Sequence, residues 1–259
     1  MSLKRIFTVF LRYLYATRDP TRITEFLVWP MIDVGFFGLI AQWSGTATGQ
    51  TQILEHFITA LILWQIIYRA NFEICVNILD EFIEKNLINL ISSPLKKREW
   101  IVGMMSSGFL KIIFTLLYGS FLGWLFFKVN VYALGYSLFP FVLLCLISGW
   151  MIGFLSAGIV IYKGSKLVQL PWVIITIAAI FSSTYYPLSV FPATMKPIAQ
   201  SLPMSYIFEG MREMLSIGSI SNRYWLYGSI LSIIYLGIAI KFFLFMFEKS
   251  RQRGLTRLP

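Results

Sequence analysis

Six long runs of apolar residues, separated by short polar or basic segments, dominate the sequence. A helix needs about 20 mostly apolar residues to cross the hydrocarbon core of a bilayer, whereas a β-barrel strand shows only about 10 alternating ones. The runs here are continuous and have the helical length. We therefore predict six membrane-spanning helices, at about residues 24–43, 53–76, 101–127, 138–162, 167–185 and 225–247.

Three further segments are amphipathic or rich in proline, and we do not expect them to cross. Residues 3–14 place their apolar side chains on one helical face, which predicts an interfacial helix that ends at Asp19-Pro20. Residues 80–99 contain a short amphipathic helix, a proline and a basic cluster. Residues 187–224 contain four prolines and two short amphipathic stretches, which favour re-entrant or interfacial helices at about 193–202 and 206–215.

The composition supports an all-α membrane protein. The chain is 57% hydrophobic and 13% charged, with a mean hydropathy of +0.72, whereas soluble domains are about 45–50% apolar and about 25% charged. The net charge of +10 does not indicate nucleic acid, because the basic residues lie in short segments between the apolar runs. In a six-span topology, the segments on the same side as the termini hold fifteen lysine and arginine residues, and the segments on the other side hold four. The positive-inside rule therefore places both termini in the cytoplasm.

These segments predict three regions along the chain. Residues 1–22 form an interfacial helix, residues 23–247 the six-helix transmembrane domain, and residues 248–259 a basic cytoplasmic tail. The first apolar run lacks the small-residue site at which a signal peptide is cleaved, so we expect the mature chain to begin at or near Met1. A stripe of small residues in the fourth run favours close packing against another helix, either within the chain or in a dimer: Gly149, Gly153 and Ala157.

The sequence offers little for catalysis. It has no phosphate-binding loop of the G-x-x-x-x-G-K-[ST] type, no hydrolytic motif and no metal-ligand spacing. The single histidine, His56, lies near the end of a span and is expected to be an interfacial polar residue. Cys75 and Cys145 lie in apolar runs, where a free thiol behaves as a small hydrophobic group. We therefore predict that the chain is not an enzyme.

Charged residues within the spans are more informative, because an ionisable group in hydrocarbon is costly unless it is paired or faces water. Asp33 and Lys111 each lie about nine residues inside their spans, on the order of 13 Å deep. We predict that they pair between the first and third spans, with Arg69 and Glu73 in a shallower ionic layer. Two interpretations of this pair stay open: a structural ion pair, or a polar point on a transport path. Apart from Asp33, little in the sequence favours a proton-coupled carrier.

Two segments carry a resemblance to a known family. One is Leu90-Ile91-Ser92-Ser93-Pro94-Leu95-Lys96-Lys97-Arg98-Glu99. The other begins Tyr186-Pro187-Leu188-Ser189-Val190-Phe191-Pro192 and continues through Leu202-Pro203-Met204-Ser205-Tyr206-Ile207-Phe208-Glu209-Gly210-Met211-Arg212. Because the two segments occur in this order within a chain of six predicted spans, the chain resembles the type-2 permeases of ATP-binding-cassette exporters. It departs from the family at Asp80-Glu81, where a Gly-Glu pair is common, which leaves the start of the coupling helix open.

The resemblance implies a permease subunit of an exporter in the bacterial inner membrane. It would form a pore with a second copy or a close relative, and it would bind a separate ATPase that holds ATP and Mg²⁺, with no cofactor in this chain. A coupling helix at about 86–93 would contact the ATPase, and the segment 187–224 would close the pore from outside. The residues implied are, for coupling, Leu87, Ile88, Leu90, Ile91, Ser93, Pro94 and Arg98, and for the gate, Pro187, Pro192, Pro203, Glu209 and Arg212.

Two questions stay open after the resemblance. The cargo is expected to be a glycan, a lipid-linked polymer or an amphipathic drug, and the apolar, aromatic spans fit each of these. The basic group Lys96-Lys97-Arg98 fits anchoring to lipid headgroups as well as docking of a partner. The alternative function is an ion- or proton-coupled secondary transporter.

Overall fold

Five helices in the described part of the chain are long and apolar enough to cross a membrane, as in a multi-pass membrane protein. The structure is a computed structural model that describes residues 1–50, 52–84, 86–164 and 167–252, without the side chains of Thr21, Leu87, Ile88 and Ile91. No strand occurs in these ranges. The five helices confirm five of the six predicted spans: α2 (Pro20–Thr48), α3 (Gln52–Ile83), α5 (Lys97–Phe127), α6 (Leu138–Lys163) and α10 (Asn222–Gln252).

Helices α3 and α6 form the centre of the bundle. They pack against each other along their length and are the most buried of the five, whereas α2 and α10 lie at the periphery. The small residues of α6 allow this close approach: a Cβ atom at Gly149 would lie 2.4 Å from the Ile67 carbonyl oxygen, and one at Gly153 would lie 2.8 Å from Cβ of Ile74. The predicted small-residue stripe therefore packs within the chain.

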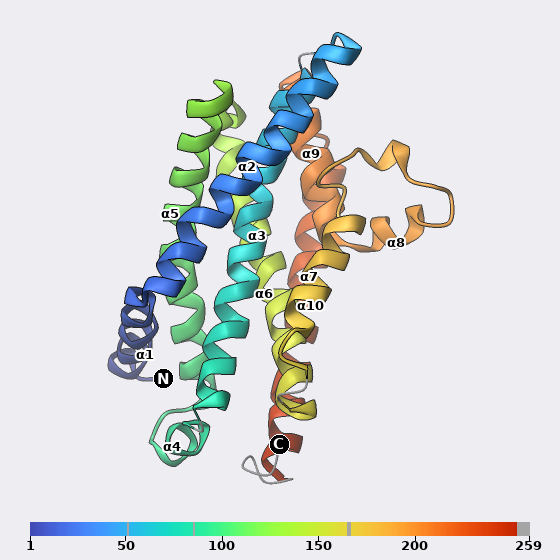
Figure 1. The fold of residues 1–259 in the computed structure, drawn as a ribbon. Coiled ribbons are helices and arrows are strands. Elements are labelled where there is room, and N and C mark those ends of the chain that lie inside the picture. Colours follow the sequence, from blue (N-terminus) through green and yellow to red (C-terminus); the bar gives the residue numbers. More distant parts are fainter. Residues whose placement is uncertain (51, 85, 165–166, 253–259) are drawn as a thin grey trace.

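Both ends of the described chain lie at the same end of the bundle, which we call the terminal end (Figure 1). Helix α1 (Leu3–Tyr15), the 3₁₀ turn η1 (Ala16–Arg18) and the short helix α4 (Leu87–Ser92) also lie there. Val9 and Tyr13 on the apolar face of α1 are buried against α5. The amphipathic helix and its end before Pro20 are confirmed.

The predicted span at 167–185 differs from the structure. Its helix α7 (Leu170–Phe181) has only 12 residues, about 18 Å of helix, which is less than a bilayer core. The chain then leaves the bundle through η4 (Leu188–Val190) and α8 (Lys196–Ser201), which project to one side (Figure 1). It returns in α9 (Pro203–Ile217), which packs on α3 and α6 as α7 does.

The two short helices predicted after residue 187 are present as α8 and α9, with bounds that differ by a few residues from those expected. Between α5 and α6, the 3₁₀ segment η2 (Val131–Ser137) turns the chain at the end opposite to the terminal end. Residues 165–166 of the predicted basic turn and 253–259 of the basic tail lie outside the described residues.

Candidate functional site

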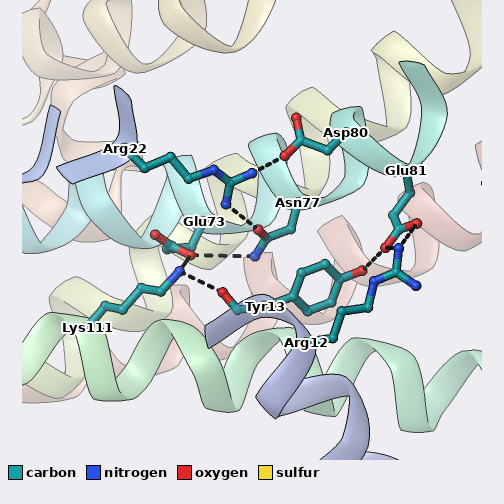
Figure 2. A network of polar contacts seen from close by, with 8 residues as sticks. All are labelled: Arg12, Tyr13, Arg22, Glu73, Asn77, Asp80, Glu81 and Lys111. Atoms are coloured by element: carbon teal, nitrogen blue, oxygen red, sulfur yellow. Dashed lines mark hydrogen bonds and ion pairs between the residues drawn. The ribbon is translucent and has the colours of Figure 1, made fainter. Parts of the chain in front are cut away.

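A polar network joins α1, α2, α3 and α5 near the terminal end (Figure 2). It is unusual for such apolar helices because most of its members are charged. Hydrogen bonds and ion pairs connect them in a chain of contacts that starts on α1 and reaches across α3 to α2 and α5. The network consists of Arg12, Tyr13, Arg22, Glu73, Asn77, Asp80, Glu81 and Lys111.

The predicted pair of Asp33 with Lys111 is wrong. Lys111 instead forms an ion pair with Glu73, and each side chain is only 5% exposed. Its ammonium group also donates to the Tyr13 carbonyl oxygen at 3.4 Å. Asp33 accepts a hydrogen bond from Gln65 Nε2 at 2.5 Å. Sequence spacing gave comparable depths but not the directions in which the helix faces point, and Lys111 faces Glu73 on α3.

Arg69 and Glu73 line the same cavity as Lys111, but Glu73 forms its ion pair with Lys111 and not with Arg69. The Arg69 guanidinium lies 4.1 Å from the centre of the Phe26 ring and 5.6 Å from that of Phe72. Its Nη2 reaches only the Glu25 carbonyl oxygen, at 3.4 Å, and Nε has no hydrogen-bond partner among the described residues. Arg69 is therefore a buried cation that packs against aromatic rings, while Glu73 forms an ion pair with Lys111.

Glu81 near the end of α3 connects α1 with the start of α4. Its carboxylate accepts from Arg12 at 2.8 Å, from the Tyr13 hydroxyl at 3.1 Å and from Asn86 at 2.6 Å. The Trp100 indole on α5 donates to the Tyr13 hydroxyl at 2.8 Å. Burial, and then the nearby Glu81 carboxylate, raise the pKa of Tyr13. The phenol therefore stays protonated and continues to donate at neutral pH.

Glu99 makes a second connection at the start of α5. Its carboxylate accepts from the Lys96 backbone N–H at 3.0 Å, which caps the helix, and from the Ser2 backbone N–H at 2.7 Å. Arg5 lies 3.5 Å from the same carboxylate and also donates to the Pro94 carbonyl oxygen. The stretch that follows α4 is thus held against the beginning of α1.

The segment expected to couple to a partner has its described residues on the surface or at its edge. Ser93, Pro94 and Arg98 are exposed, and Leu90 packs partly against the core. The side chains of Leu87, Ile88 and Ile91 lie outside the described ones. A cavity of about 320 Å³ separates α4 from α1. The segment is therefore accessible at the terminal end and supported from α1.

The expected gate residues are only partly brought together. Glu209 on α9 accepts from the Leu188 backbone N–H at 2.8 Å and from Arg212 at 2.9 Å. Arg212 also donates to the carbonyl oxygens of Ser183 and Thr184, just after α7. This pair fixes the break between α7 and α9. Of the three prolines, Pro187 precedes η4, Pro192 lies in an exposed turn, and Pro203 is buried at the start of α9.

Sequence reasoning missed Tyr13, Glu81 and Glu99, which link the elements at the terminal end. Glu99 had a readable signal, because it follows Lys96 by three residues, as a capping glutamate does. Glu81 had none beyond its charge. Its role depends on α1, whose partners are distant in the sequence.

Comparison with known proteins does not assign this chain to a family. No family model matches the sequence, and no curated protein matches it. Over the residues that the structure describes, the fold defines the class of an all-helical protein with five apolar helices long enough to cross a membrane.

Proposed function

We propose that this chain is the transmembrane permease subunit of an ATP-binding-cassette exporter, which forms the substrate path and is driven by a separate ATPase subunit. The cargo class is a glycan, a lipid-linked polymer or an amphipathic drug. The chain itself would bind no ATP or Mg²⁺, since both belong to the ATPase.

The observation that carries this proposal is the attachment of α4. This short helix directly joins α3 to α5, lies at the terminal end, and leaves Ser93, Pro94 and Arg98 exposed next to it. Glu81 and Glu99 tie the flanks of α4 to α1. A partner that presses on α4 would therefore move α1, α3 and α5 as one unit, which is what transmission of ATPase closure to a membrane path requires.

The topology we propose has six crossings, with α7 and α9 in series as the fifth. Five crossings would leave the two termini at opposite ends, whereas Figure 1 has them at one end. The Ser205 hydroxyl at the start of α9 donates to the Phe181 carbonyl oxygen at the end of α7, at 3.1 Å. The excess of lysine and arginine supports a cytoplasmic position for the terminal end, and the location we propose is the inner membrane of a bacterial cell.

A second copy of the chain, or a close relative, would complete the pore. The peripheral helix α2 supports this arrangement, because it is the least buried of the five long helices and still carries the half-buried Asp33. On the opposite side of the membrane, the segment 187–224 would form the gate. Its closed position would depend on the contacts of Glu209 and Arg212.

The test is purification of the tagged chain from its native membrane in mild detergent, followed by assay for bound ATPase activity. We expect an ATPase to co-purify, and we expect replacement of residues 87–92 by a Gly/Ser sequence to release it. The control is Tyr136→Ser in the exposed turn at the other end, which should retain the ATPase. Recovery of the folded chain without an ATPase, together with full transport by the 87–92 replacement, would refute the proposal.

A second candidate is an ion- or proton-coupled secondary transporter. One observation favours it: the break between α7 and α9, together with the half-buried Asp33 on the neighbouring α2, is an arrangement that such carriers use for binding. Reconstitution of the chain alone into liposomes separates the two candidates. Uptake driven by an ion gradient without ATP supports the carrier and contradicts the exporter.

A further inference from the structure

A cavity of about 350 Å³ opens beside the polar network, between η1, α2, α3 and α5. Three cationic side chains reach it from three helices: Arg22 from α2, Arg69 from α3 and Lys111 from α5. One carboxylate, Glu73, also lines the cavity, and the rest of its wall is largely apolar. The cavity therefore combines three cations and one anion with hydrocarbon-like sides, and this excess of positive charge complements an anionic amphiphile.

Two of the three cations already have carboxylate partners. Arg22 pairs with Asp80, and Lys111 pairs with Glu73. Arg69 has no carboxylate within 4 Å among the described residues. Arg69 is therefore the cation in this cavity that forms no ion pair with a described side chain, because the Glu73 carboxylate in the same cavity is paired with Lys111.

Arg69 is also poorly satisfied as a hydrogen-bond donor. The residue is only 4% exposed, its Nη2 makes one long contact at 3.4 Å, and Nε makes none. The faces of the guanidinium are covered by Phe26 and Phe72, which leaves the edge with its N–H groups for a ligand. A buried charge without a partner is strongly unfavourable, so an anion at this edge would remove a large penalty.

The chemistry of the site favours phosphate. The planar fork of a guanidinium binds the oxygens of a phosphate in a bidentate manner, with charge-assisted hydrogen bonds. Arg22 and Lys111 line the same cavity and outnumber its one carboxylate, Glu73, so the surroundings of Arg69 also favour a negatively charged group.

The apolar wall indicates what carries the phosphate. Ile23, Leu27, Leu110 and Phe114 line the cavity and are themselves exposed on the surface of the bundle. A hydrocarbon chain can therefore run from the cavity along this surface without crossing a polar barrier. The cavity shares Arg22, Glu73 and Lys111 with the polar network, near the terminal end, where the headgroups of one leaflet are expected.

We propose that this cavity binds the phosphate group of a membrane lipid, with Arg69 as its principal ligand. The phosphate sits against the edge of the guanidinium, and the lipid chains lie along α2 and α5. The inference does not depend on the proposed function, because any multi-pass protein with this cavity would hold such a lipid.

The experiment compares wild type, Arg69→Gln, Arg69→Lys and the matched control Arg223→Gln, whose arginine is exposed on α10. Each delipidated protein is mixed with phosphatidylglycerol, or with diacylglycerol, which has no phosphate. Binding is measured by native mass spectrometry and by the shift in melting temperature. We expect phosphatidylglycerol to stabilise wild type and the control, and Arg69→Gln to bind it at least about tenfold more weakly, with Arg69→Lys between them.

A second measurement guards against misfolding of Arg69→Gln. Without lipid, this variant no longer buries an unpaired charge, so it should melt at the same temperature as delipidated wild type or higher. If it does not fold, Leu110→Trp fills the cavity from its exposed side, keeps Arg69, and should also lose the phosphatidylglycerol-dependent shift. Equal binding of diacylglycerol and phosphatidylglycerol by wild type, or unchanged phosphatidylglycerol binding in Arg69→Gln and in Leu110→Trp, overturns the proposal.

A competition arm identifies the source of the phosphate. Displacement of phosphatidylglycerol from wild type by a polyprenyl diphosphate, together with weak binding of the polyprenyl diphosphate by Arg69→Gln, identifies the site as one for a lipid-linked substrate. Retention of phosphatidylglycerol in excess polyprenyl diphosphate identifies a site for membrane phospholipid. Both results support phosphate recognition by Arg69.

Discussion

The Glu73–Lys111 pair allows a quantitative test of how charge is tolerated inside this bundle. Both side chains are 5% exposed, so removal of one leaves the other charged, buried and unpaired. We expect Glu73→Gln or Lys111→Met alone to lower the free energy of unfolding by ~3–5 kcal/mol. The double variant removes both charges, and we expect it to recover most of this loss, to within about 1–2 kcal/mol of wild type.

The assay is unfolding in SDS followed by tryptophan fluorescence, for wild type, both single variants and the double variant. The matched control is the pair Lys97–Glu248, whose side chains are 45% and 32% exposed, with Lys97→Met and Glu248→Gln. An exposed pair contributes about 0–1 kcal/mol, so its double-variant cycle should show little coupling. If the losses at Glu73 and Lys111 simply add in the double variant, the reasoning about a mutually dependent buried pair is refuted.

Three further outcomes follow from contacts described above. Gly149→Ala should destabilise the bundle by about 1–3 kcal/mol in the same SDS titration, because the added Cβ atom would lie 2.5 Å from Cβ of Ala70. The control is Gly237→Ala on α10, whose added Cβ atom would meet no atom within 4 Å, and which should leave the stability unchanged. Arg212→Lys loses the guanidinium fork that holds two carbonyl groups after α7, so amide hydrogen exchange should rise in residues 182–190; unchanged exchange would contradict this clamp. Both cysteines are buried, and maleimide should label them only after denaturation.

The hydrophobic pattern predicted the five long helices because a long, continuous apolar run is stable across a membrane only as a helix. The sequence was less informative for residues 167–185, because this run is apolar on average and its composition does not show where the helix ends. Ser182, Ser183 and Thr184 interrupt the run, and the backbone carbonyls of Ser183 and Thr184 accept hydrogen bonds from Arg212 on α9. That contact is long-range, so the local composition did not reveal it.

The candidate site shows a second limit of sequence reasoning. Counting residues from the span ends gave Asp33 and Lys111 comparable depths, but a partner is chosen by the direction in which each helix face points. Lys111 meets Glu73, and Asp33 meets Gln65. The position of α1 was equally inaccessible, because its amphipathic pattern predicted a lipid-facing surface and not the docking of Tyr13 between Glu81 and Trp100.

The contacts of α1 also bear on the order in which the protein assembles during synthesis. This helix is made before the elements that it contacts: the partners of Tyr13 and Ser2 follow them by 68 and 97 residues, at Glu81 and Glu99. Until the end of α3 has been synthesised, α1 lacks Glu81, and until the beginning of α5 has been synthesised it lacks Trp100 and Glu99. Its amphipathic face gives it a place to wait on the membrane surface. Helix α1 therefore precedes α3 and α5 in synthesis but docks after them, and its docking fixes the two flanks of α4 through Glu81 and Glu99.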